Sequence, residues 1–338
     1  MHMWGIQAWK RLIPRGQKRE EARSGQSSEL RTGSVRFLRK EECGQFGLLS
    51  GISKLHCSLS APLLFSDMLK TIPIINNKGG VGKTTTTVNL AAGLGREGRR
   101  VLVVDLDSQG SASLALGIDR EDLEPSTASV LFGEKAPSDV IQRTATRNVD
   151  VLSGSLRLAD ADTKLSSVDG RENRLTQSLS GIEEDYDTIL IDCAPSTSLL
   201  TVNALVAADA FIIPVSPSYL SLEGVVSLGE VVKNVRMSLG EAAPVLGVLI
   251  TMVQRDDEQT RAIIDEVRGH YGGKVFDIEI QQDAAIEEAP THGQSVFDYA
   301  PGSQGADEYQ MLVDEVLDRL DRYGSVYDTV RKKQARRT

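Results

Sequence analysis

The chain has 338 residues, enough for one large α/β domain or two modest ones, and its 40% hydrophobic and 25% charged residues are the proportions of an ordinary globular protein. No apolar run reaches the roughly 18 residues that a membrane-spanning helix needs, so the sequence argues against an integral membrane protein and predicts a cytoplasmic one. The three cysteines have neither metal-ligand spacing nor the pattern of a disulfide framework.

Charge divides the chain into two unlike parts. Residues 1–67 hold eleven Lys/Arg and six Asp/Glu, whereas residues 68–338 hold 27 basic and 41 acidic residues, a balance of −14. The acidic body argues against a broad DNA-coating surface and leaves room only for a local basic patch. Residues 1–67 show no sustained periodicity, and their glutamates do not fit a targeting sequence, so we predict a disordered extension or a mis-assigned start.

From Met68 onward, short apolar runs alternate with amphipathic segments. We therefore predict a folded domain at residues 68–325, followed by a basic tail at residues 326–338. The predicted strands are residues 71–76, 100–105, 148–152, 188–192, 210–215 and 244–253. The predicted helices are residues 84–97, 174–182, 198–208, 221–239, 258–271 and 306–323. Strands separated by helices imply right-handed crossovers, and hence an α/β fold with a doubly wound, mainly parallel sheet flanked by helices.

A glycine-rich loop lies between the first predicted strand and helix. Residues 76–85 read N-N-K-G-G-V-G-K-T-T, and the glycines allow backbone N–H groups to converge on phosphate oxygens at a helix N-terminus. Lys83 is expected to neutralise the β- and γ-phosphates, and the Thr84 hydroxyl to complete a Mg²⁺ shell. Asn77 stands where the strict pattern has its first glycine. The residues expected to bind nucleotide are Lys78, Gly79, Gly80, Val81, Gly82, Lys83, Thr84 and Thr85.

Carboxylates end two of the buried strands. Asp105 and Asp107 follow the run V-L-V-V, and strand alternation predicts that they lie on one side, where one positions water and the other supports it. Asp192 ends the run I-L-I, as a Walker-B carboxylate does, and is expected to lie near Thr84 and the metal. Cys193, which follows it, is predicted to be a small buried thiol.

Together these motifs resemble the deviant Walker-A, or ParA/MinD, superfamily of P-loop ATPases. The resemblance implies that Lys78 reaches the partner's phosphates across a dimer and that Asp107 is associated with the attacking water. Four segments resemble the ParA/Soj branch in particular: residues 107–113, 219–224, 288–293 and 299–306. His292, in the third of these, is given no chemical role.

One departure from the ParA/Soj pattern concerns DNA. The arginines that the family uses for non-specific DNA binding, in a stretch like I-P-R-x-V-R-L, are replaced here at Gln282 and Ala285. Each lost phosphate contact weakens binding, which makes DNA a doubtful partner. Candidate replacements are Arg255, Arg261, Arg268, Lys274 and the basic residues of 331–337.

The resemblance implies ATP and Mg²⁺ as cofactors, an ATP-dependent homodimer, slow ATP hydrolysis stimulated by a ParB-like or other adaptor protein, and a role in chromosome or plasmid partitioning. DNA binding would make the protein nucleoid-associated. The alternative is a cargo-positioning or regulatory ATPase with weak or no DNA binding, including a membrane switch of the MinD type. That switch needs an amphipathic end, for which only Val326, Tyr327 and Val330 are available.

Overall fold

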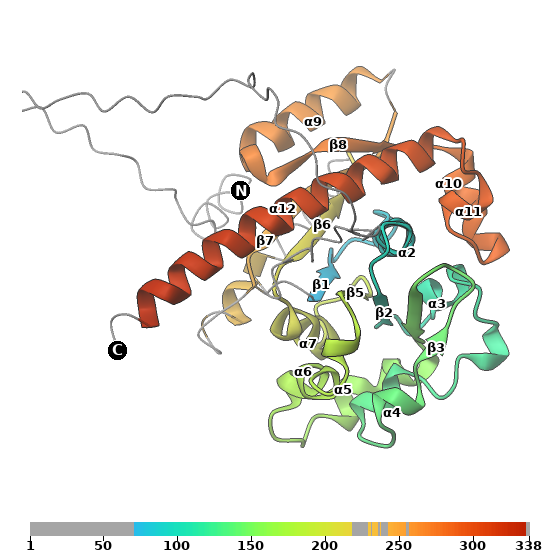
Figure 1. Ribbon diagram of the computed structural model, residues 1–338, viewed down its shortest axis with the longest axis vertical. Helices are drawn as coiled ribbons and strands as arrows, with labels where there is room; N and C mark the ends of the chain where they lie inside the picture. The colour runs from blue at the N-terminus through green and yellow to red at the C-terminus, as the bar shows by residue number, and fades with distance from the viewer. Residues whose placement is uncertain are drawn as a thin grey trace, which may run out of the picture. The chain divides into compact units, whose positions relative to one another are not determined.

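The computed structural model describes residues 71–217, 229–230, 232–235, 237, 243–254 and 257–335, with side chains as far as residue 322 (Figure 1). The extension 1–67, the start at Met68, the segment 219–224 and Arg255 lie outside these residues. No helix within the described ranges is long and apolar enough to cross a bilayer.

The described residues contain one eight-stranded sheet with the order β3-β4-β2-β5-β1-β6-β7-β8. Every neighbouring pair is parallel except β3–β4, which confirms the predicted mainly parallel sheet. The strands are β1 (Thr71–Ile74), β2 (Val101–Asp105), β3 (Gln142–Arg143), β4 (Val149–Leu152), β5 (Thr188–Asp192), β6 (Phe211–Val215), β7 (Val245–Val253) and β8 (Val275–Gln281).

Helices cover both faces of the sheet, which is why the central strands are apolar throughout. The main helices are α2 (Lys83–Arg96), α6 (Arg174–Leu179), α7 (Leu199–Ala207), α9 (Glu258–Tyr271) and α12 (Gln304–Ala335). Shorter helices are α3 (Ser111–Ala115), α4 (Thr127–Leu131), α5 (Ala161–Lys164), α10 (Ala284–Glu288) and α11 (Val296–Tyr299). Single 3-10 turns are η1 (Arg120–Asp122), η2 (Pro137–Asp139), η3 (Leu156–Asp160), η4 (Arg171–Asn173), η5 (Glu183–Asp185), η6 (Gly272–Lys274) and η7 (Ala289–His292).

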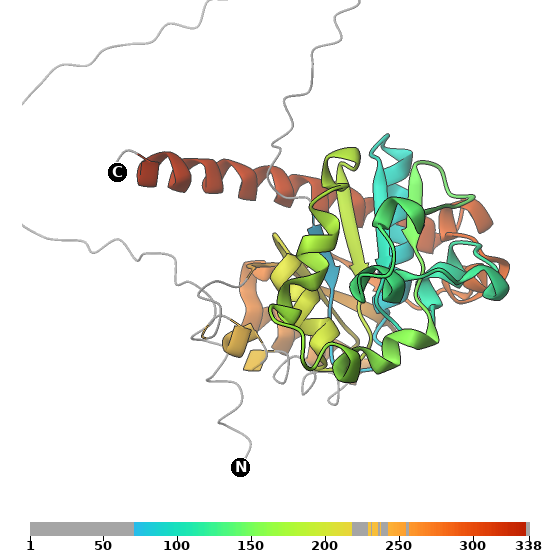
Figure 2. The same ribbon diagram turned by 90° about the horizontal axis from the view of Figure 1, so that it is seen from below.

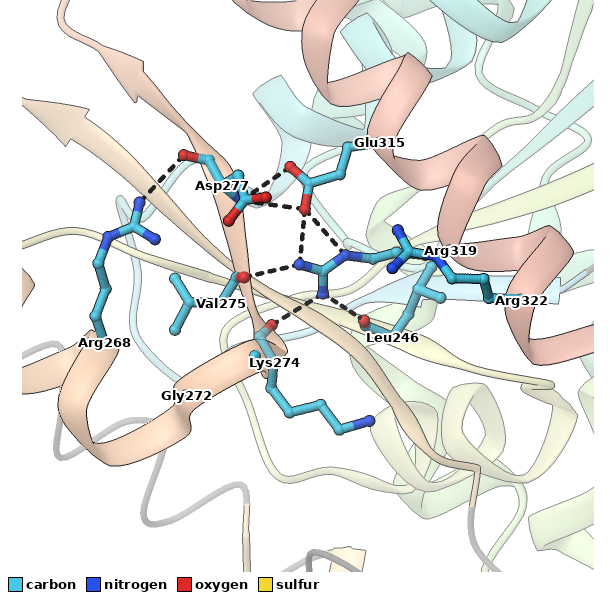
Figure 3. A pocket seen from close by; sticks show the side chains of 10 residues that line it. Leu246, Arg268, Gly272, Lys274, Val275, Asp277, Glu315, Arg319 and Arg322 are labelled. Carbon is cyan, nitrogen blue, oxygen red and sulfur yellow. Dashed lines mark hydrogen bonds and ion pairs between the residues drawn. The ribbon is translucent and has the colours of Figure 1, made fainter. Parts of the chain in front are cut away.

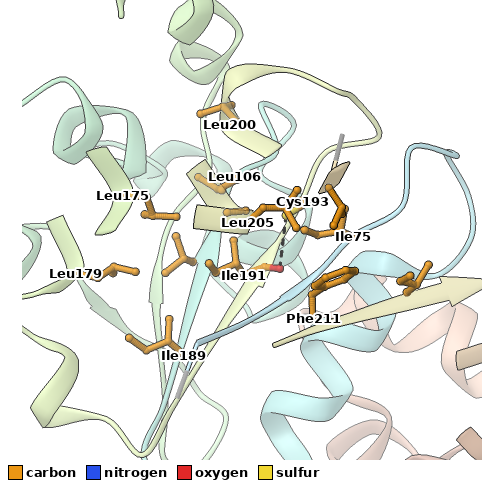
Figure 4. Packing of buried hydrophobic residues seen from close by; sticks show 14 of the residues in the cluster. Ile75, Leu106, Leu175, Leu179, Ile189, Ile191, Cys193, Leu200, Leu205 and Phe211 are labelled. Atoms are coloured by element: carbon orange, nitrogen blue, oxygen red, sulfur yellow. Dashed lines mark hydrogen bonds between the residues drawn. The ribbon is translucent and has the colours of Figure 1, made fainter. Parts of the chain in front are cut away.

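Each face has its own core. On one face α2, α11 and α12 pack on the sheet, and on the other α6, α7 and α9 do. Figure 4 shows the second core, in which Cys193 packs beside Ile75, Leu106 and Leu205. Cys193 is buried and unbridged, as predicted, and burial raises the pKa of its thiol.

The helices α2 and α12 approach closely at Gly93. A Cβ built there would lie 2.4 Å from Cγ2 of Val313, so only glycine fits between the two helices without rearrangement. Tyr309 of α12 is fully buried against the same face. The helix that begins at the glycine-rich loop is therefore held by the last helix of the chain.

The fold contains elements that were not predicted. These are the strands β3 and β8 and the short helices α3, α4, α5, α10 and α11, and α12 continues to Ala335 rather than ending at residue 323 (Figure 2). β8 is difficult to predict from the sequence because Asp277 and Glu279 interrupt its apolar residues. The strand lies at one end of the sheet order and is covered by α12.

Candidate functional site

The chemistry-bearing segments meet at one edge of the sheet. β2, β5 and β1 are adjacent, and Asp105 pairs in register with Asp192, which in turn pairs with Ile74. Because parallel strands end on the same side, the glycine-rich loop after β1 and both carboxylates lie together at their carboxyl ends. The sequence analysis predicted that these residues lie near one another, and in the fold they do.

Asn76 and the glycines shape the loop. The Asn76 side-chain amide donates to the Pro214 carbonyl at 2.7 Å, and its Oδ1 accepts from the Lys78 N–H at 3.0 Å. Gly80 and Gly82 have φ of 66° and 79°, a left-handed conformation that side chains disfavour. Gly82 is also the N-cap of α2, so the turn points the helix N-terminus at the space above the loop.

Lys83 is folded onto its own loop. Its ammonium donates to the Lys78 carbonyl at 2.8 Å, and the residue is 7% exposed. Burial lowers the pKa of this ammonium from its ordinary value, whereas nearby Asp192 acts in the opposite direction. The loop therefore presents one positive charge at its centre, next to convergent backbone N–H groups, which is the arrangement that binds a phosphate.

Asp192 lies beneath the first turn of α2. The Thr84 hydroxyl donates to Asp192 Oδ2 at 2.7 Å, and the Thr87 hydroxyl lies 3.3 Å from Oδ1. Burial raises the pKa of Asp192 to about 8, and the neighbouring carboxylate of Asp105 adds to the rise. A buried carboxyl with so high a pKa gains most from a cation, and a hydroxyl beside a carboxylate is an oxygen donor pair that suits Mg²⁺.

Mg²⁺ commonly takes only one or two protein carboxylates and completes its shell with water and phosphate oxygens. Among the described residues there is no group of three or more His, Cys, Asp and Glu side chains that could hold a metal by itself. Thr84 and Asp192 thus fit a Mg²⁺ that arrives with a nucleotide, and they do not resemble a closed structural metal site.

Asp105 and Asp107 have different environments, and only Asp105 belongs to the strand on which the prediction that they lie on one side was based. β2 ends at Asp105, so alternation no longer applies at Asp107. Asp105 is fully buried, and it accepts from the N–H and hydroxyl of Ser113 at 3.0 and 2.8 Å and from the Asp107 N–H at 3.0 Å. Burial raises its pKa to about 6. Asp105 therefore organises the loop, and Asp107 is the more accessible carboxylate.

Two residues that the sequence analysis did not single out hold this loop in place. The Ser113 hydroxyl, which donates to Asp105, also accepts from the Gly154 N–H at 3.0 Å. A Cβ built on Gly154 would lie 2.5 Å from the Asp107 carbonyl oxygen and 2.7 Å from Asp105 Cγ. The D-S-Q-G-S-A-S segment contained Ser113, but nothing in the sequence indicated that residue 154 packs on it.

The segment E-A-P-T-H-G packs against the end of α3, the short helix that follows this loop. Gly293 lies so close to Gly117, at the end of α3, that a Cβ on Gly293 would be 2.8 Å from the Gly117 Cα. His292 Nδ1 lies 3.2 Å from the Glu288 carbonyl oxygen, and its ring lies 4.8 Å from that of Tyr299. His292 thus contacts residues of its own segment and of α11.

Residues 280–286, which lack the arginines of the family, make contacts with neutral and acidic side chains. Gln282 Oε1 accepts from Gln254 Nε2 at 2.7 Å, and Ala285 lies in the first turn of α10, where its N–H donates to the side chain of the N-cap Asp283 at 2.8 Å. Of the candidate replacements, Arg268 forms an ion pair with Glu279 at 2.7 Å. The two positions themselves carry an amide and a methyl side chain, neither of which is charged.

Comparison with known proteins gives a consistent set of relatives. Residues 69–243 match the family model described as an AAA domain. The chain is 41% identical over 249 residues to the sporulation initiation inhibitor protein Soj of Bacillus subtilis, a match that covers 74% of this chain and 98% of Soj. It is 37% identical over 253 residues to the chromosome partitioning protein ParA of Caulobacter vibrioides, covering 74% of this chain and 95% of ParA.

Among solved structures, the septum site-determining protein MinD of Pyrococcus horikoshii, complexed with Mg-ADP, is similar with a TM-score of 0.62 and 28% identity. That match covers 74% of this chain and 96% of the MinD chain. The similarity therefore extends over most of the chain rather than over one motif.

Proposed function

The chain belongs to the ParA/Soj family of the ParA/MinD superfamily of P-loop ATPases, and from that premise we propose that it binds Mg·ATP at the loop between β1 and α2 and hydrolyses it slowly. The observation that carries the proposal is the meeting of Lys83, Thr84 and Asp192 at one point. The Lys83 ammonium donates to the Lys78 carbonyl of the loop at 2.8 Å, and the Thr84 hydroxyl donates to the Asp192 carboxylate at 2.7 Å. A cation, a hydroxyl and a carboxylate at a helix N-terminus are what phosphoryl transfer requires.

The proposed roles follow from position. Lys83 leaves the Lys78 carbonyl and neutralises the β- and γ-phosphates in cis. Thr84 and Asp192 hold Mg²⁺, which when bound neutralises charge on the phosphates. Asp107, which is partly exposed at the same edge, orients the attacking water, and Lys78 contacts the phosphates of a partner subunit in trans.

The nucleotide would act as a switch between a monomer and a homodimer that encloses two nucleotides. Each state then selects different partners, because a ligand shifts an equilibrium by its differential affinity for the two states. Relatives that carry the names chromosome partitioning protein and Soj support a role in partitioning DNA, with a ParB-like or other adaptor protein that stimulates turnover.

A second candidate is a cargo-positioning or regulatory ATPase with weak DNA binding. Gln282 and Ala285, which stand where the family has arginines, favour it because neither side chain is charged. Sedimentation with anionic liposomes, with and without ATP, tests its membrane-switch form. ATP-dependent sedimentation of the protein with liposomes, together with no ATP-dependent DNA binding, would favour this candidate over partitioning.

The main proposal is tested by measuring phosphate release and molecular mass in solution with Mg·ATP, Mg·ADP and ATP plus EDTA. We expect hydrolysis that requires Mg²⁺, and a dimer in ATP alone. Thr84→Ala should abolish both effects, whereas the matched control Thr163→Ala, at an exposed position on α5, should retain them. Absence of hydrolysis and of ATP binding in the folded wild-type protein would overturn the proposal.

A further inference from the structure

The strand β7 is fixed at its amino end by the last helix of the chain. The Arg319 guanidinium of α12 donates to the carbonyl of Leu246 in β7 at 2.9 Å (Figure 3). It also donates to the carbonyls of Lys274 and Val275, where β8 begins, at 3.1 and 2.7 Å. These bonds line a cavity of about 590 Å³ whose cations come from α9, η6 and α12. Because the amino ends of both strands are held, an irregularity in their pairing is taken up further along.

Toward its carboxyl end β7 contains one residue more than a regular pairing requires. Ile250 pairs with Glu279 and Val253 with Gln281, so three steps along β7 match two along β8. Both Ile250 and Val253 pack in the core of α6, α7 and α9, although side chains three positions apart in a regular strand lie on opposite faces. The extra residue is a β-bulge, and it lies between these two positions.

Met252 carries this irregularity. Its φ is 57°, in the left-handed region that a bulky side chain rarely adopts, and it is 37% exposed between buried neighbours. Such a conformation persists only where the surrounding structure holds it, and bulges are common beside functional sites, where they change the direction of a side chain. The side chain that precedes this position belongs to Thr251.

Thr251 contacts the glycine-rich loop from the end of β7. Its hydroxyl donates to the Val81 carbonyl at 3.0 Å, and the residue is 2% exposed. A Cβ built on Gly82, the N-cap of α2, would lie 3.7 Å from Cβ and Cγ2 of Thr251, so the two residues are also packed together. Thr251 thus holds the loop on the side of β7, as Asn76 does on the side of β6 through its bond to the Pro214 carbonyl.

The bond to Val81 fixes the direction of a neighbouring donor. The Val81 carbonyl and the Gly82 N–H belong to one planar, trans peptide unit, in which the two groups point in opposite directions. Because Thr251 holds the carbonyl on the side of β7, the Gly82 N–H points away from β7, at the N-terminal end of α2. Backbone N–H groups at a helix N-terminus are donors for phosphate oxygens.

We propose that Thr251 is a positioning residue for the phosphate-binding loop, and that the bulge at Met252 directs its hydroxyl to that loop. By holding the Val81 carbonyl, Thr251 orients the Gly82 N–H into the space that the phosphates of a nucleotide occupy. It acts through the loop backbone and does not touch the phosphates itself. The inference rests on the proposed function for the identity of the ligand, whereas the restraint on the loop is independent of it.

The experiment separates the hydroxyl from the shape of the side chain. Thr251→Val removes the hydroxyl with little change of shape, and Thr251→Ser retains it. The matched control is Thr144→Val, because the Thr144 hydroxyl also donates to a carbonyl, that of Val149 at the amino end of β4, at 2.7 Å. For each full-length protein we would measure KM and kcat for Mg·ATP and the affinity for Mg·ADP. Hydrogen exchange of residues 77–86 is measured without nucleotide.

Thr251→Val should raise the KM for ATP and the dissociation constant for ADP by about 10-fold and leave kcat nearly unchanged, because a hydrogen bond to a charged phosphate is made in the ground state and the transition state alike. The loop should also exchange faster in this variant. Thr251→Ser and Thr144→Val should both behave like the wild-type protein. A purely structural role would lower the stability of Thr251→Val without changing KM.

The bulge is tested at Met252. Met252→Val should weaken nucleotide binding in the same way, since a β-branched side chain opposes a left-handed backbone, whereas Met252→Gly should not. Wild-type KM and loop exchange in Thr251→Val would overturn the inference, as would an equal loss in Thr251→Ser. If the wild-type protein bound no nucleotide, the proposed function would fail, and loop exchange would still decide whether Thr251 positions the loop.

Discussion

Gly154 offers a way to displace the proposed catalytic loop without touching the phosphate-binding loop. An added Cβ would lie 2.5 Å from the Asp107 carbonyl oxygen, whereas ordinary contacts begin at 3.4 Å. Gly154→Ala must therefore move the two segments apart by about 0.9 Å. Gly154 is buried, and the hydrogen bond from its N–H to Ser113 ties it to the Asp105–Ser113 segment, so the movement displaces the backbone of Asp107.

A shift of that size has a calculable cost. A misplacement of about 1 Å lowers the rate of a positioned reaction by about 100-fold, or about 2.7 kcal/mol in the barrier. Overpacking of this kind also lowers the free energy of unfolding by about 1 to 3 kcal/mol. Because Lys83 and Thr84 are untouched, the KM for ATP should stay close to its wild-type value while kcat falls.

The assay is steady-state phosphate release by Gly154→Ala, with Gly181→Ala as the matched control because a Cβ there meets nothing within 4 Å. If Gly154 acts through Asp107, then Gly154→Ala/Asp107→Ala should be no slower than Asp107→Ala alone. A folded Gly154→Ala protein with wild-type kcat, or a loss that is fully additive with Asp107→Ala, would refute this reasoning.

Three further predictions concern other parts of the site and its supports. Lys78→Ala should abolish ATP-dependent dimerisation, measured by light scattering, but should leave the binding of ATP by the monomer intact. If the variant still forms a dimer and hydrolyses ATP normally, Lys78 does not act on the phosphates of a partner subunit. Gly93→Ala should lower the free energy of unfolding in urea by about 1 to 3 kcal/mol through its clash with Val313, and Gly93→Ala/Val313→Ala should recover much of the loss; an unchanged urea midpoint would be the contrary result. In Mg²⁺-free, nucleotide-free protein, the raised pKa of Asp192 means that the folded state keeps a proton that the unfolded state releases, so the free energy of unfolding should fall as pH rises from about 4 toward 8. Asp192→Asn should flatten this fall between pH 6 and 8, and an equally steep curve in urea melts of the variant would count against the assignment.

The meeting of Lys83, Thr84 and Asp192 could be predicted because it follows from two local facts. Each residue ends or follows an apolar strand, and parallel strands end on the same side of a sheet. The different environments of Asp105 and Asp107 could not be predicted, since they depend on the residue at which β2 ends. That end is determined by the hydrogen bonds of Asp105 within the loop and not by strand alternation.

Contacts between distant segments were also beyond the sequence. Gly93 and Val313 lie 220 positions apart, and their contact appears only once α12 is laid across α2. The cavity at the amino ends of β7 and β8 combines cations from three elements, of which the sequence analysis singled out Arg268 and Lys274 only as separate residues. A linear pattern indicates which side chains carry charge, but the strand order decides which of them share a space.

The close packing of α2 against α12 has a consequence for how the protein is made. α2 begins at Lys83 and α12 ends at Ala335, so the ribosome adds 252 residues between the first and the last. At about 5 to 20 residues per second, α2 waits roughly 13 to 50 s for its covering helix. During that interval the nascent chain displays the apolar face around Gly93, and a message cut short before α12 would yield a product with this face permanently bare, open to chaperones and proteases.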